Sequence, residues 1–374
     1  TVVRAALDQV PQLDPEAIDD LLLGCGQPGG ESGFNLARVV AVRLGYDDLP
    51  GATITRYCSS SLQTTRMAMH AIRAGEGDVF ISAGVETVSR AVKGNSDTLP
   101  DTENPVFDDA KARTATAAAG GGPVWHDPRE DGALPDVYIA MGQTAENVAA
   151  LRGVTRAEQD EFAVRSQNLA EQAIKDGFYA REITPVTLPD GTVVDTDDGP
   201  RPGATLETAS RLKPVFRSDG TVTAGNCCAL NDGAAALVVM SEHKARELGI
   251  TPLARVVATG LSALSPEIMG LGPVQASRRA LANANMTIDD VDLVEINEAF
   301  AAQVIPSYRD LGIDLDRLNV HGGAIALGHP FGMTGARITC TLLNGLARRD
   351  KTVGLATMCV GGGQGMAMIL ERLS

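Results

Sequence analysis

The two ends of the chain follow the same residue pattern, and this internal repeat restricts the fold more than any other feature. Residues 68–84 align with residues 342–358 at an offset of 274, and residues 17–24 align with residues 290–297. Helical stretches alternate with apolar strand-like stretches in both regions, so the repeat indicates two similar α/β halves. Two pseudo-symmetric halves would bring matching strand ends to one shared cleft.

The alternation of helices and strands breaks between about residues 90 and 230. Residues 91–136 are rich in Gly, Pro, Asp and Ala and are too long for an ordinary connection, which favours a functional or oligomer-forming excursion. The alternation returns from Asn231 to the end of the chain. We therefore expect an N-terminal half, an inserted loop domain and a C-terminal half, at residues 1–90, 91–230 and 231–374.

Composition and charge exclude several classes of protein. Hydrophobic residues make up 44% of the 374 residues and charged residues 21%, which suits a large buried core and not a disordered chain. The net charge of -15 argues against nucleic acid or an anionic membrane as a partner. No stretch reaches the roughly 18 consecutive apolar residues of a membrane span.

The cysteines indicate the compartment. The six of them form no C-x-x-C pair, and their spacing fits neither a zinc site nor a small disulfide scaffold. The N-terminal residues lack the basic-then-apolar pattern of a secretion signal. We expect free thiols in a reducing, cytoplasmic setting, and no metal site.

Cys58 is the first candidate for chemistry. It lies in ITRYCSSSLQ, after a short apolar strand and directly before a helix. Unsatisfied N–H groups and the dipole at a helix N-terminus favour the thiolate, so this position suits a nucleophile. A buried structural cysteine explains the position equally well.

The second candidate is Cys359, in LATMCVGGGQGMA. A strand here runs directly into three glycines, beginning with Gly361, so backbone N–H groups can face a ligand without interference from Cβ atoms. Such groups form oxyanion holes, where one donor is typically worth about 2.7–4 kcal/mol in the transition state. The alternative is a tight turn beside a buried cysteine.

His329 and Asn297 complete the set. His329 lies between Gly328 and Pro330, where a histidine more often faces a ligand than packs in a core, although a satisfied loop histidine stays possible. Asn297 follows an apolar strand and precedes a helix, and its amide could hold a water or an oxygen atom. Together these residues indicate thiol chemistry with two cysteines, one histidine and glycine-rich oxyanion donors.

These motifs resemble those of the thiolases, the acetyl-CoA acetyltransferases and 3-ketoacyl-CoA thiolases, over essentially the whole chain. The resemblance implies a duplicated αβαβα layered fold with two similar halves and an inserted loop domain. The segments that carry it are NEAFAA at 297–302, GGAIALGHPFGMTGAR at 322–337, CVGGGQG at 359–365, GQTAENVA at 142–149 and VTAGNCCALNDGAAA at 222–236.

The resemblance implies a role for each candidate. Cys58 would carry the acyl group, and His329 would accept its proton. Cys359 would be the second acid/base, which protonates the leaving acetyl-CoA enolate in thiolysis or removes the α-proton in condensation. His329 and a water held by Asn297 would form one oxyanion hole, and the N–H groups of Cys58 and Gly361 the other. Two half-reactions through an acyl-enzyme predict ping-pong kinetics.

The same resemblance implies that coenzyme A binds as a substrate against the inserted segment, with no covalently bound cofactor. Arg201 matches a position near the nucleotide end and supplies positive charge in an otherwise acidic chain. An ordinary core position explains each apolar match about equally well. The other matched positions line the adenine and pantetheine (Phe216, Ala224, Cys228) or the acyl pocket (Met141, Phe300).

Four residues depart from the family pattern. Thr55 stands where Asn is usual, and Ser61 where Gly is frequent. Cys228 replaces a serine that hydrogen-bonds pantetheine, and a thiol is a weaker donor. Ala140 stands where acetoacetyl-specific members carry a histidine, which leaves longer or unusual 3-ketoacyl chains open.

Assembly and the start of the chain are also expectations from the family. Thiolases favour a homodimer as the minimal unit, and the region of residues 91–136 often governs tetramers, so we expect a homodimer or homotetramer. The family's first strand would lie upstream of Thr1, and we expect that the sequence has been trimmed there.

The leading hypothesis is a CoA-dependent acyltransferase that cleaves a 3-ketoacyl-CoA with CoA or condenses acetyl-CoA units. A ketosynthase-type condensing enzyme would use two histidines, so Cys359 argues against it. A catalytically silent, acyl-CoA-binding scaffold of the same fold is the alternative from another class. A cysteine hydrolase would need a group to orient His329, and no second motif supplies one.

Overall fold

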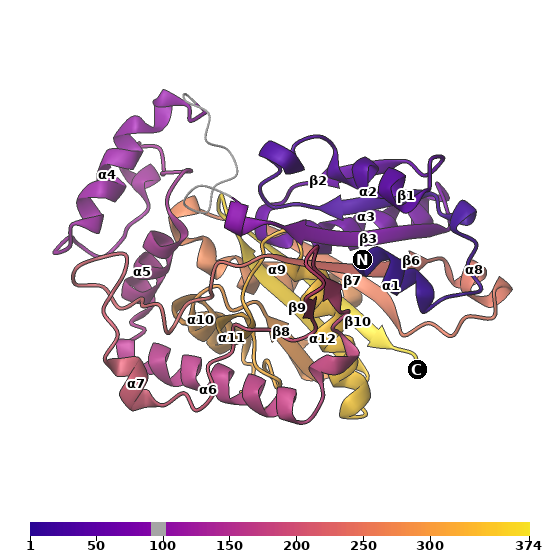
Figure 1. The fold of residues 1–374 in the computed structure, drawn as a ribbon. Helices are drawn as coiled ribbons and strands as arrows, with labels where there is room; N and C mark the ends of the chain where they lie inside the picture. Colours follow the sequence, from indigo (N-terminus) through magenta and orange to yellow (C-terminus); the bar gives the residue numbers. More distant parts are fainter. Residues whose placement is uncertain (91–101) are drawn as a thin grey trace.

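Two four-stranded sheets form the frame of the protein (Figure 1). The computed structural model describes residues 1–90 and 102–374. The first sheet has the order β2-β1-β3-β6, in which β6 alone runs antiparallel to its neighbour. Its strands are β1 (Asp20–Gly24), β2 (Gly51–Ile54), β3 (Val79–Glu86) and β6 (Gly233–Met240).

The second sheet repeats this arrangement. Its order is β7-β10-β9-β8, with β8 parallel to β9 and β10 antiparallel to both β9 and β7. The series β8-β9-β10 therefore matches β1-β3-β6 in order and direction. The strands are β7 (Ala254–Ala263), β8 (Leu293–Ile296), β9 (Val353–Val360) and β10 (Gln364–Arg372).

One pair of aspartates shows the duplication at the level of single hydrogen bonds. Asp19 Oδ2 accepts from the N–H groups of Asp78 and Val79, at 2.7 and 2.9 Å, just before β1 and β3. Asp292 Oδ2 accepts in the same way from the N–H groups of residues 352 and 353, both at 2.9 Å. The repeat seen in the sequence is thus confirmed as two similar α/β halves.

Helices form the layers around and between the sheets (Figure 1). Helices α3 (Ser60–Ala74) and α12 (Thr334–Arg348) pack on each other between the sheets. Helix α3 ends at Gly75, whose φ of 76° is the left-handed conformation that glycine adopts without strain. The outer helices are α1 (Val2–Asp8) and α2 (Leu36–Leu44) on the first sheet, with α9 (Gly272–Ala284) on the second and α10 (Ala301–Leu311) beside α9.

The inserted segment supplies helices on one side of this frame. Within the excursion expected at residues 91–136, the structure forms α4, and residues 91–101 lie outside the described part of the chain. Helices α5 and α6 both pack against α10, which places them beside the C-terminal half. The inserted elements are α4 (Asp108–Ala118), α5 (Met141–Arg152), α6 (Arg156–Lys175), β4 (Val186–Thr187), β5 (Val193–Val194) and α7 (Leu206–Ser210).

The division expected at residue 231 does not match the strand pairing. Strand β6 lies beyond that position, yet every one of its residues pairs with β3 of the first sheet. The chain thus returns to the N-terminal half after the inserted segment. Helix α8 (Glu242–Glu247) follows β6, and the second sheet begins only with β7.

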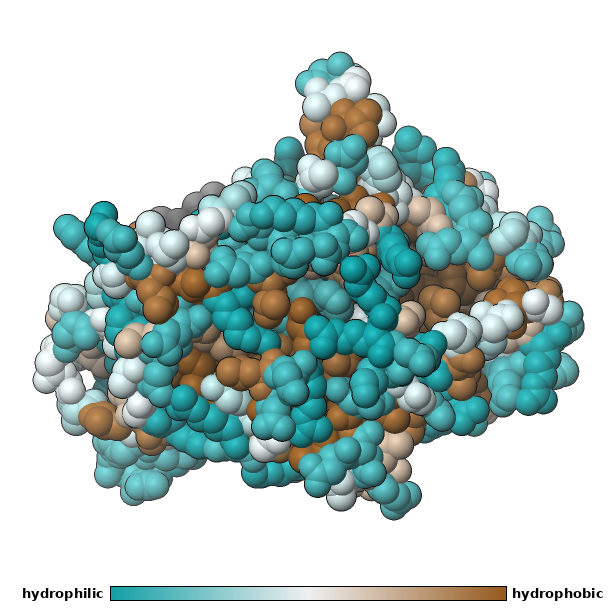
Figure 2. Space-filling model, turned by 90° about the horizontal axis from the view of Figure 1, so that it is seen from below, coloured by the Kyte–Doolittle hydropathy of each residue, from teal (hydrophilic) through white to brown (hydrophobic). Residues whose placement is uncertain are grey.

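Hydrophilic residues cover most of the face shown in Figure 2, with smaller hydrophobic patches among them. Across residues 1–90 and 102–374, no helix combines the length and the apolar character needed to cross a membrane.

Shortening Leu342 to alanine should destabilise the central helical layer. Leu342 is 1% exposed on α12 and belongs to the same core cluster as Cys58 and Met358. We expect Leu342→Ala to lower the free energy of unfolding by about 2–5 kcal/mol, because a buried cavity adds to the lost apolar contact. Urea denaturation measures the change. The matched control is Leu373→Ala at a site that is 44% exposed, where we expect less than about 0.5 kcal/mol; equal losses in the two variants would contradict the assigned core.

Candidate active site

A tight turn between β2 and α3 presents Cys58. Tyr57, the residue before it, has a φ of 42°, a left-handed conformation that is uncommon for a residue with a side chain. The turn is held by the Ser60 hydroxyl, which donates to the Tyr57 carbonyl at 2.6 Å and accepts from the Arg56 N–H at 2.9 Å. The turn directs Cys58 into the interior, where only 8% of the residue is exposed.

The Cys58 thiol is neutral in this environment. Burial raises its pKa to about 11, and Glu86 adds a smaller upward push. The backbone N–H groups of Gly361 and of Cys58 itself act in the opposite direction and lower this pKa. The helix N-terminus was expected to favour the thiolate, but desolvation outweighs it. The resting nucleophile therefore needs a base.

Cys359 lies next to Cys58 although the two come from different halves. It is fully buried near the end of β9, and its pKa is raised well above the usual value, first by burial and then by the charge of Cys58. Cys228 from the inserted segment joins them, since its own pKa is raised by burial and then by Cys227, Cys58 and Cys359. The three thiols are thus close enough to shift one another's pKa.

His329 is held in one tautomer. The Thr334 hydroxyl donates its only proton to the Pro330 carbonyl oxygen at 2.8 Å. Its oxygen, 2.7 Å from His329 Nδ1, must then accept a hydrogen bond from Nδ1–H. The other ring nitrogen, Nε2, is left without a proton and with a lone pair to act as a base. The backbone N–H of His329 donates to Asn231 Oδ1 at 2.9 Å, which fixes the loop.

Burial also keeps the imidazole neutral. His329 is 2% exposed, and burial lowers its pKa to about 3, with a further contribution from the positive charge of Arg337. Asn297 Nδ2 lies 3.3 Å from His329 Nε2. Within the described part of the chain, Asn297 Oδ1 is buried and accepts no hydrogen bond, so it can accept one from a water. This agrees with an amide that holds a water beside the histidine.

Glu298, the residue after Asn297, anchors the loop that carries Asn297. This fully buried carboxylate accepts from Ser166 Oγ at 2.5 Å, Asn319 Nδ2 at 2.8 Å and the Ile325 N–H at 3.1 Å. It therefore joins α6, the end of β8 and the helix α11 (Ala324–Leu327) that leads to His329.

The positions matched to coenzyme A and the acyl chain converge on this junction. Phe216 and Phe300 make an edge-to-face contact with centroids 6.2 Å apart, and Met141 and Phe216 pack on the core cluster that contains Phe300 and Cys359. Arg201 donates to the Ala224 carbonyl at 3.2 Å. Cys228 donates its backbone N–H to the Ala299 carbonyl at 3.0 Å. The inserted segment is thereby tied to the Asn297 loop.

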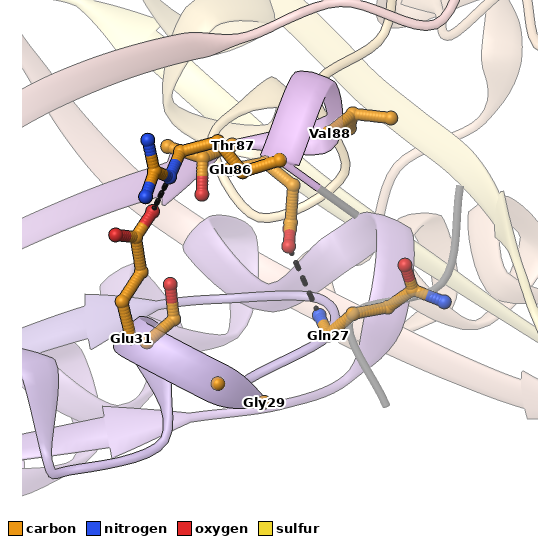
Figure 3. A pocket seen from close by; sticks show the side chains of 9 residues that line it. Gln27, Gly29, Glu31, Glu86, Thr87 and Val88 are labelled. Carbon is orange, nitrogen blue, oxygen red and sulfur yellow. Dashed lines mark hydrogen bonds and ion pairs between the residues drawn. The ribbon is translucent and has the colours of Figure 1, made fainter. Parts of the chain in front are cut away.

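Sequence reasoning missed the residue that links the first half to the histidine loop. Glu86, at the end of β3, accepts from the N–H groups of Gly26 at 2.7 Å, Gln27 at 3.2 Å and Gly332 at 2.7 Å. A small pocket of about 160 Å³ lies beside it, closed on one side by the ion pair of Glu31 and Arg90 (Figure 3). The one feature of the sequence that could have pointed to Glu86 is its position at the end of an apolar strand.

A second, larger cavity of about 1130 Å³ runs along β6 and between the edges of the two sheets. Neither it nor the small pocket is lined by Cys58, His329 or Cys359. The candidate active site is therefore defined by convergent chemical groups and not by either cavity.

A buried thiol with two backbone donors, a neutral imidazole and a second thiol define an enzyme that transfers acyl groups. Comparison with known proteins agrees. Residues 1–243 match the family described as thiolase, N-terminal domain, and residues 250–372 match thiolase, C-terminal domain. The chain belongs to the thiolase family, whose members are acyltransferases.

Individual relatives cover nearly the whole chain. An acetyl-CoA acetyltransferase of Cupriavidus necator is 44% identical over 379 residues, which cover 99% of this chain and 92% of that protein. A 3-oxoadipyl-CoA/3-oxo-5,6-dehydrosuberyl-CoA thiolase of Escherichia coli is 42% identical over 99% of this chain and 92% of that protein. The crystal structure of human mitochondrial 3-ketoacyl-CoA thiolase in complex with CoA superimposes with a TM-score of 0.84, at 35% identity and over 99% of this chain and 90% of that one.

His329 should not titrate over the working range of most enzymes. With a pKa of about 3, below the ordinary value of 6.5, the folded protein keeps the ring neutral while the unfolded chain takes up a proton. We therefore expect this residue's contribution to stability to be full above about pH 6.5 and to fall as the pH drops toward 3. Imidazole ¹⁵N shifts from pH 5 to 8 should show Nδ1 protonated throughout; a midpoint near 6.5 would contradict the burial argument.

Removing the Thr334 hydroxyl should release the tautomer. Thr334→Val keeps the side-chain shape but leaves Nδ1 without an acceptor, so the proton can move to Nε2 and block the base. We expect kcat to fall about 10- to 100-fold with little change in KM, within the range for general-base effects. Thr334→Ser, which keeps the hydroxyl, is the matched control. Full activity of the valine variant would show that Thr334 does not set the tautomer.

Proposed function

We propose that the protein exchanges acyl groups between 3-ketoacyl-CoA and CoA through an acyl-thioester on Cys58, and condenses acetyl-CoA units in the reverse direction. The observation that carries the proposal is the Cys58 sulfur itself. Its pKa is lowered by two backbone N–H groups, those of Cys58 and Gly361, and it is close enough to the second thiol, Cys359, to raise the pKa of that thiol.

The first half-reaction forms the acyl-enzyme. His329 Nε2 removes the proton of the Cys58 thiol, and the sulfur attacks the 3-keto carbonyl carbon in thiolysis or the thioester carbonyl carbon of acetyl-CoA in condensation. The N–H groups of Cys58 and Gly361 stabilise the resulting oxyanion. The bond from this carbon to the leaving group then breaks. The leaving group is the enolate of acetyl-CoA in thiolysis and the thiolate of CoA in condensation.

The second acid/base is Cys359. In thiolysis its thiol protonates the departing enolate carbon, and in condensation its thiolate removes a proton from the α-carbon of acetyl-CoA. His329, once its Nε2 carries the proton taken from Cys58, and a water bound to Asn297 stabilise the enolate oxygen. Asn297 Oδ1 supports the water's role because it can still accept a hydrogen bond. A thiol is a weak base for a thioester α-carbon, so this stabilisation is required.

Coenzyme A lies against the inserted segment in this proposal. Arg201 faces its nucleotide end, Phe216, Ala224 and Cys228 its adenine and pantetheine, and Met141 and Phe300 the acyl chain, as the contacts among these residues support. The relatives named above act, by their names, on substrates as different as acetyl-CoA and 3-oxoadipyl-CoA. Ala140, in place of a histidine, favours 3-ketoacyl chains longer than acetoacetyl.

The working unit is a cytoplasmic homodimer or homotetramer. Among residues 1–90 and 102–374, strand β2 is the edge of the first sheet and pairs with β1 alone. Apolar side chains beside it are exposed, among them Phe34 at 85%, Val42 at 49% and Tyr57 at 49%. An unpaired strand edge next to such residues suits contact with a second copy. The part of the inserted segment that contains α4 is the proposed site of tetramer contacts. The six free cysteines suit a reducing compartment.

Acetyl-CoA alone should label one cysteine. We expect mass spectrometry after incubation to find the acetyl group on Cys58, and none in Cys58→Ala. Cys359→Ala should still be acetylated, because acetyl-CoA expels CoA thiolate and no enolate has to be protonated, but thiolysis should fall at least about 10³-fold without the acid/base group. Label on Cys359 would reverse the two roles.

Chain length is measured separately. We expect CoA-dependent loss of 3-ketoacyl-CoA to be faster for chains of six or more carbons than for acetoacetyl-CoA, in terms of kcat/KM, because Ala140 stands where acetoacetyl-specific thiolases carry a histidine. Ala140→His should shift the preference toward acetoacetyl-CoA. A wild-type protein most active on acetoacetyl-CoA would contradict the assignment to longer chains, and no activity on any chain would favour a silent scaffold.

A further inference from the structure

A continuous chain of side-chain hydrogen bonds connects helix α3 to the glycine turn after β9. Arg56 Nε donates to Gln63 Oε1 of α3 at 3.1 Å, and Arg56 Nη1 donates to Gln364 Oε1 at 2.9 Å. Gln364 Nε2 in turn donates to the Gly361 carbonyl oxygen at 3.3 Å. This Arg56 relay, formed by Gln63, Arg56 and Gln364, spans the two halves and ends on the residue whose N–H faces the Cys58 sulfur.

The glycine turn needs such support. Gly362 and Gly363 have φ values of 74° and 79°, and residues 361–363 carry no side chains that could pack. A run of glycines loses more conformational freedom on ordering than any other sequence. The far end of the turn is held by the Leu264 N–H, which donates to the Gly363 carbonyl at 2.8 Å. At the near end, the Gly361 carbonyl is held by Gln364.

The position of Gly361 matters because an oxyanion hole works by preorganisation. Its two donors, the N–H groups of Cys58 and Gly361, belong to segments about 300 residues apart. A donor that is displaced from the developing negative charge loses much of its effect on the rate. Arg56 precedes Cys58 by two residues, and its backbone is fixed to the start of α3 by Ser60. It is thus tied to both donors at once.

We propose that Arg56 is a positioning residue for acyl transfer, which holds the N–H of Gly361 in register with that of Cys58 through Gln364. The inference rests on the proposed function of Cys58 as the acyl carrier. The planar guanidinium of Arg56 is suited to this role because it donates in two directions from a fixed geometry, which a lysine ammonium does not.

Two reactions of the same sulfur separate this role from a general effect on the thiol. Acetylation of Cys58 by acetyl-CoA passes through an oxyanion and needs both donors. Alkylation of Cys58 by iodoacetamide needs a reactive, accessible thiolate but forms no oxyanion. The rates of both, measured on the Cys58 peptide by mass spectrometry under single-turnover conditions, are compared for wild type, Arg56→Met and Gln364→Met.

We expect acetylation to slow about 10- to 100-fold in each variant, somewhat less than the loss of a whole oxyanion donor. Alkylation should stay within about threefold of wild type, because thiolate reactivity is set by the surroundings of the sulfur. Arg56→Lys should recover part of the acetylation rate. The double variant should be no slower than either single one, since both break one relay. Arg246→Met, which removes a 77% exposed arginine on α8, is the matched control.

Each other outcome overturns the proposal. Parallel losses in acetylation and alkylation would assign Arg56 to thiol activation or to folding. Unchanged acetylation, or additive losses in the double variant, would show that no relay operates. If wild-type Cys58 itself is alkylated but never acetylated, the proposed function fails, and the role of Arg56 fails with it.

Discussion

The meeting of the Cys58 turn with the glycine turn after β9 is the contact on which the site depends: Tyr57 lies against Gly361, and the Gly361 N–H lowers the pKa of the Cys58 thiol. It joins the start of α3 in the first half to the turn after β9 in the second. It forms only because α3 and α12 pack on each other between the sheets and align the ends of both. The hydrogen bonds that Glu86 accepts from the Gly332 N–H and Glu298 from the Ile325 N–H help to keep the two halves aligned at the site.

Burial then decides the charge state of the groups so aligned. The pKa of Cys58 rises to about 11 and that of His329 falls to about 3, so the resting site holds a neutral thiol and a neutral imidazole. Negative charge becomes favourable only where backbone donors already point, at the thioester oxygen. A buried site of this kind avoids a permanently reactive thiolate and still provides a proton acceptor, because Thr334 leaves Nε2 of His329 unprotonated.

Much of this arrangement could be predicted from the sequence, and the remainder has physical causes. The glycines after Cys359 and the strand-to-helix position of Cys58 are local signals, and the structure places both residues at the junction of the halves. The place of β6 could not be read locally, since its partner β3 lies about 150 residues earlier in the chain. The prediction of a thiolate at Cys58 was wrong, because the start of a helix can be recognised in a sequence whereas the desolvation of a buried thiol cannot. The role of Thr334 could not be read from the sequence, since it depends on the hydroxyl donating to the Pro330 carbonyl while its oxygen accepts from His329 Nδ1–H.

The duplication has a consequence for how the reacting groups are distributed. At the 274-residue offset, the turn before α3 that carries Cys58 corresponds to the loop before α12, close to His329. The end of β9 that carries Cys359 likewise corresponds to the end of β3, where Glu86 lies. The scaffold is symmetric and the proposed chemistry is not: in the proposed mechanism the nucleophile belongs to one half, and its base and the second acid belong to the other. Neither half alone contains a complete set, so the molecule resembles a heterodimer fused into one chain, and its active site exists only while the two parts remain packed together.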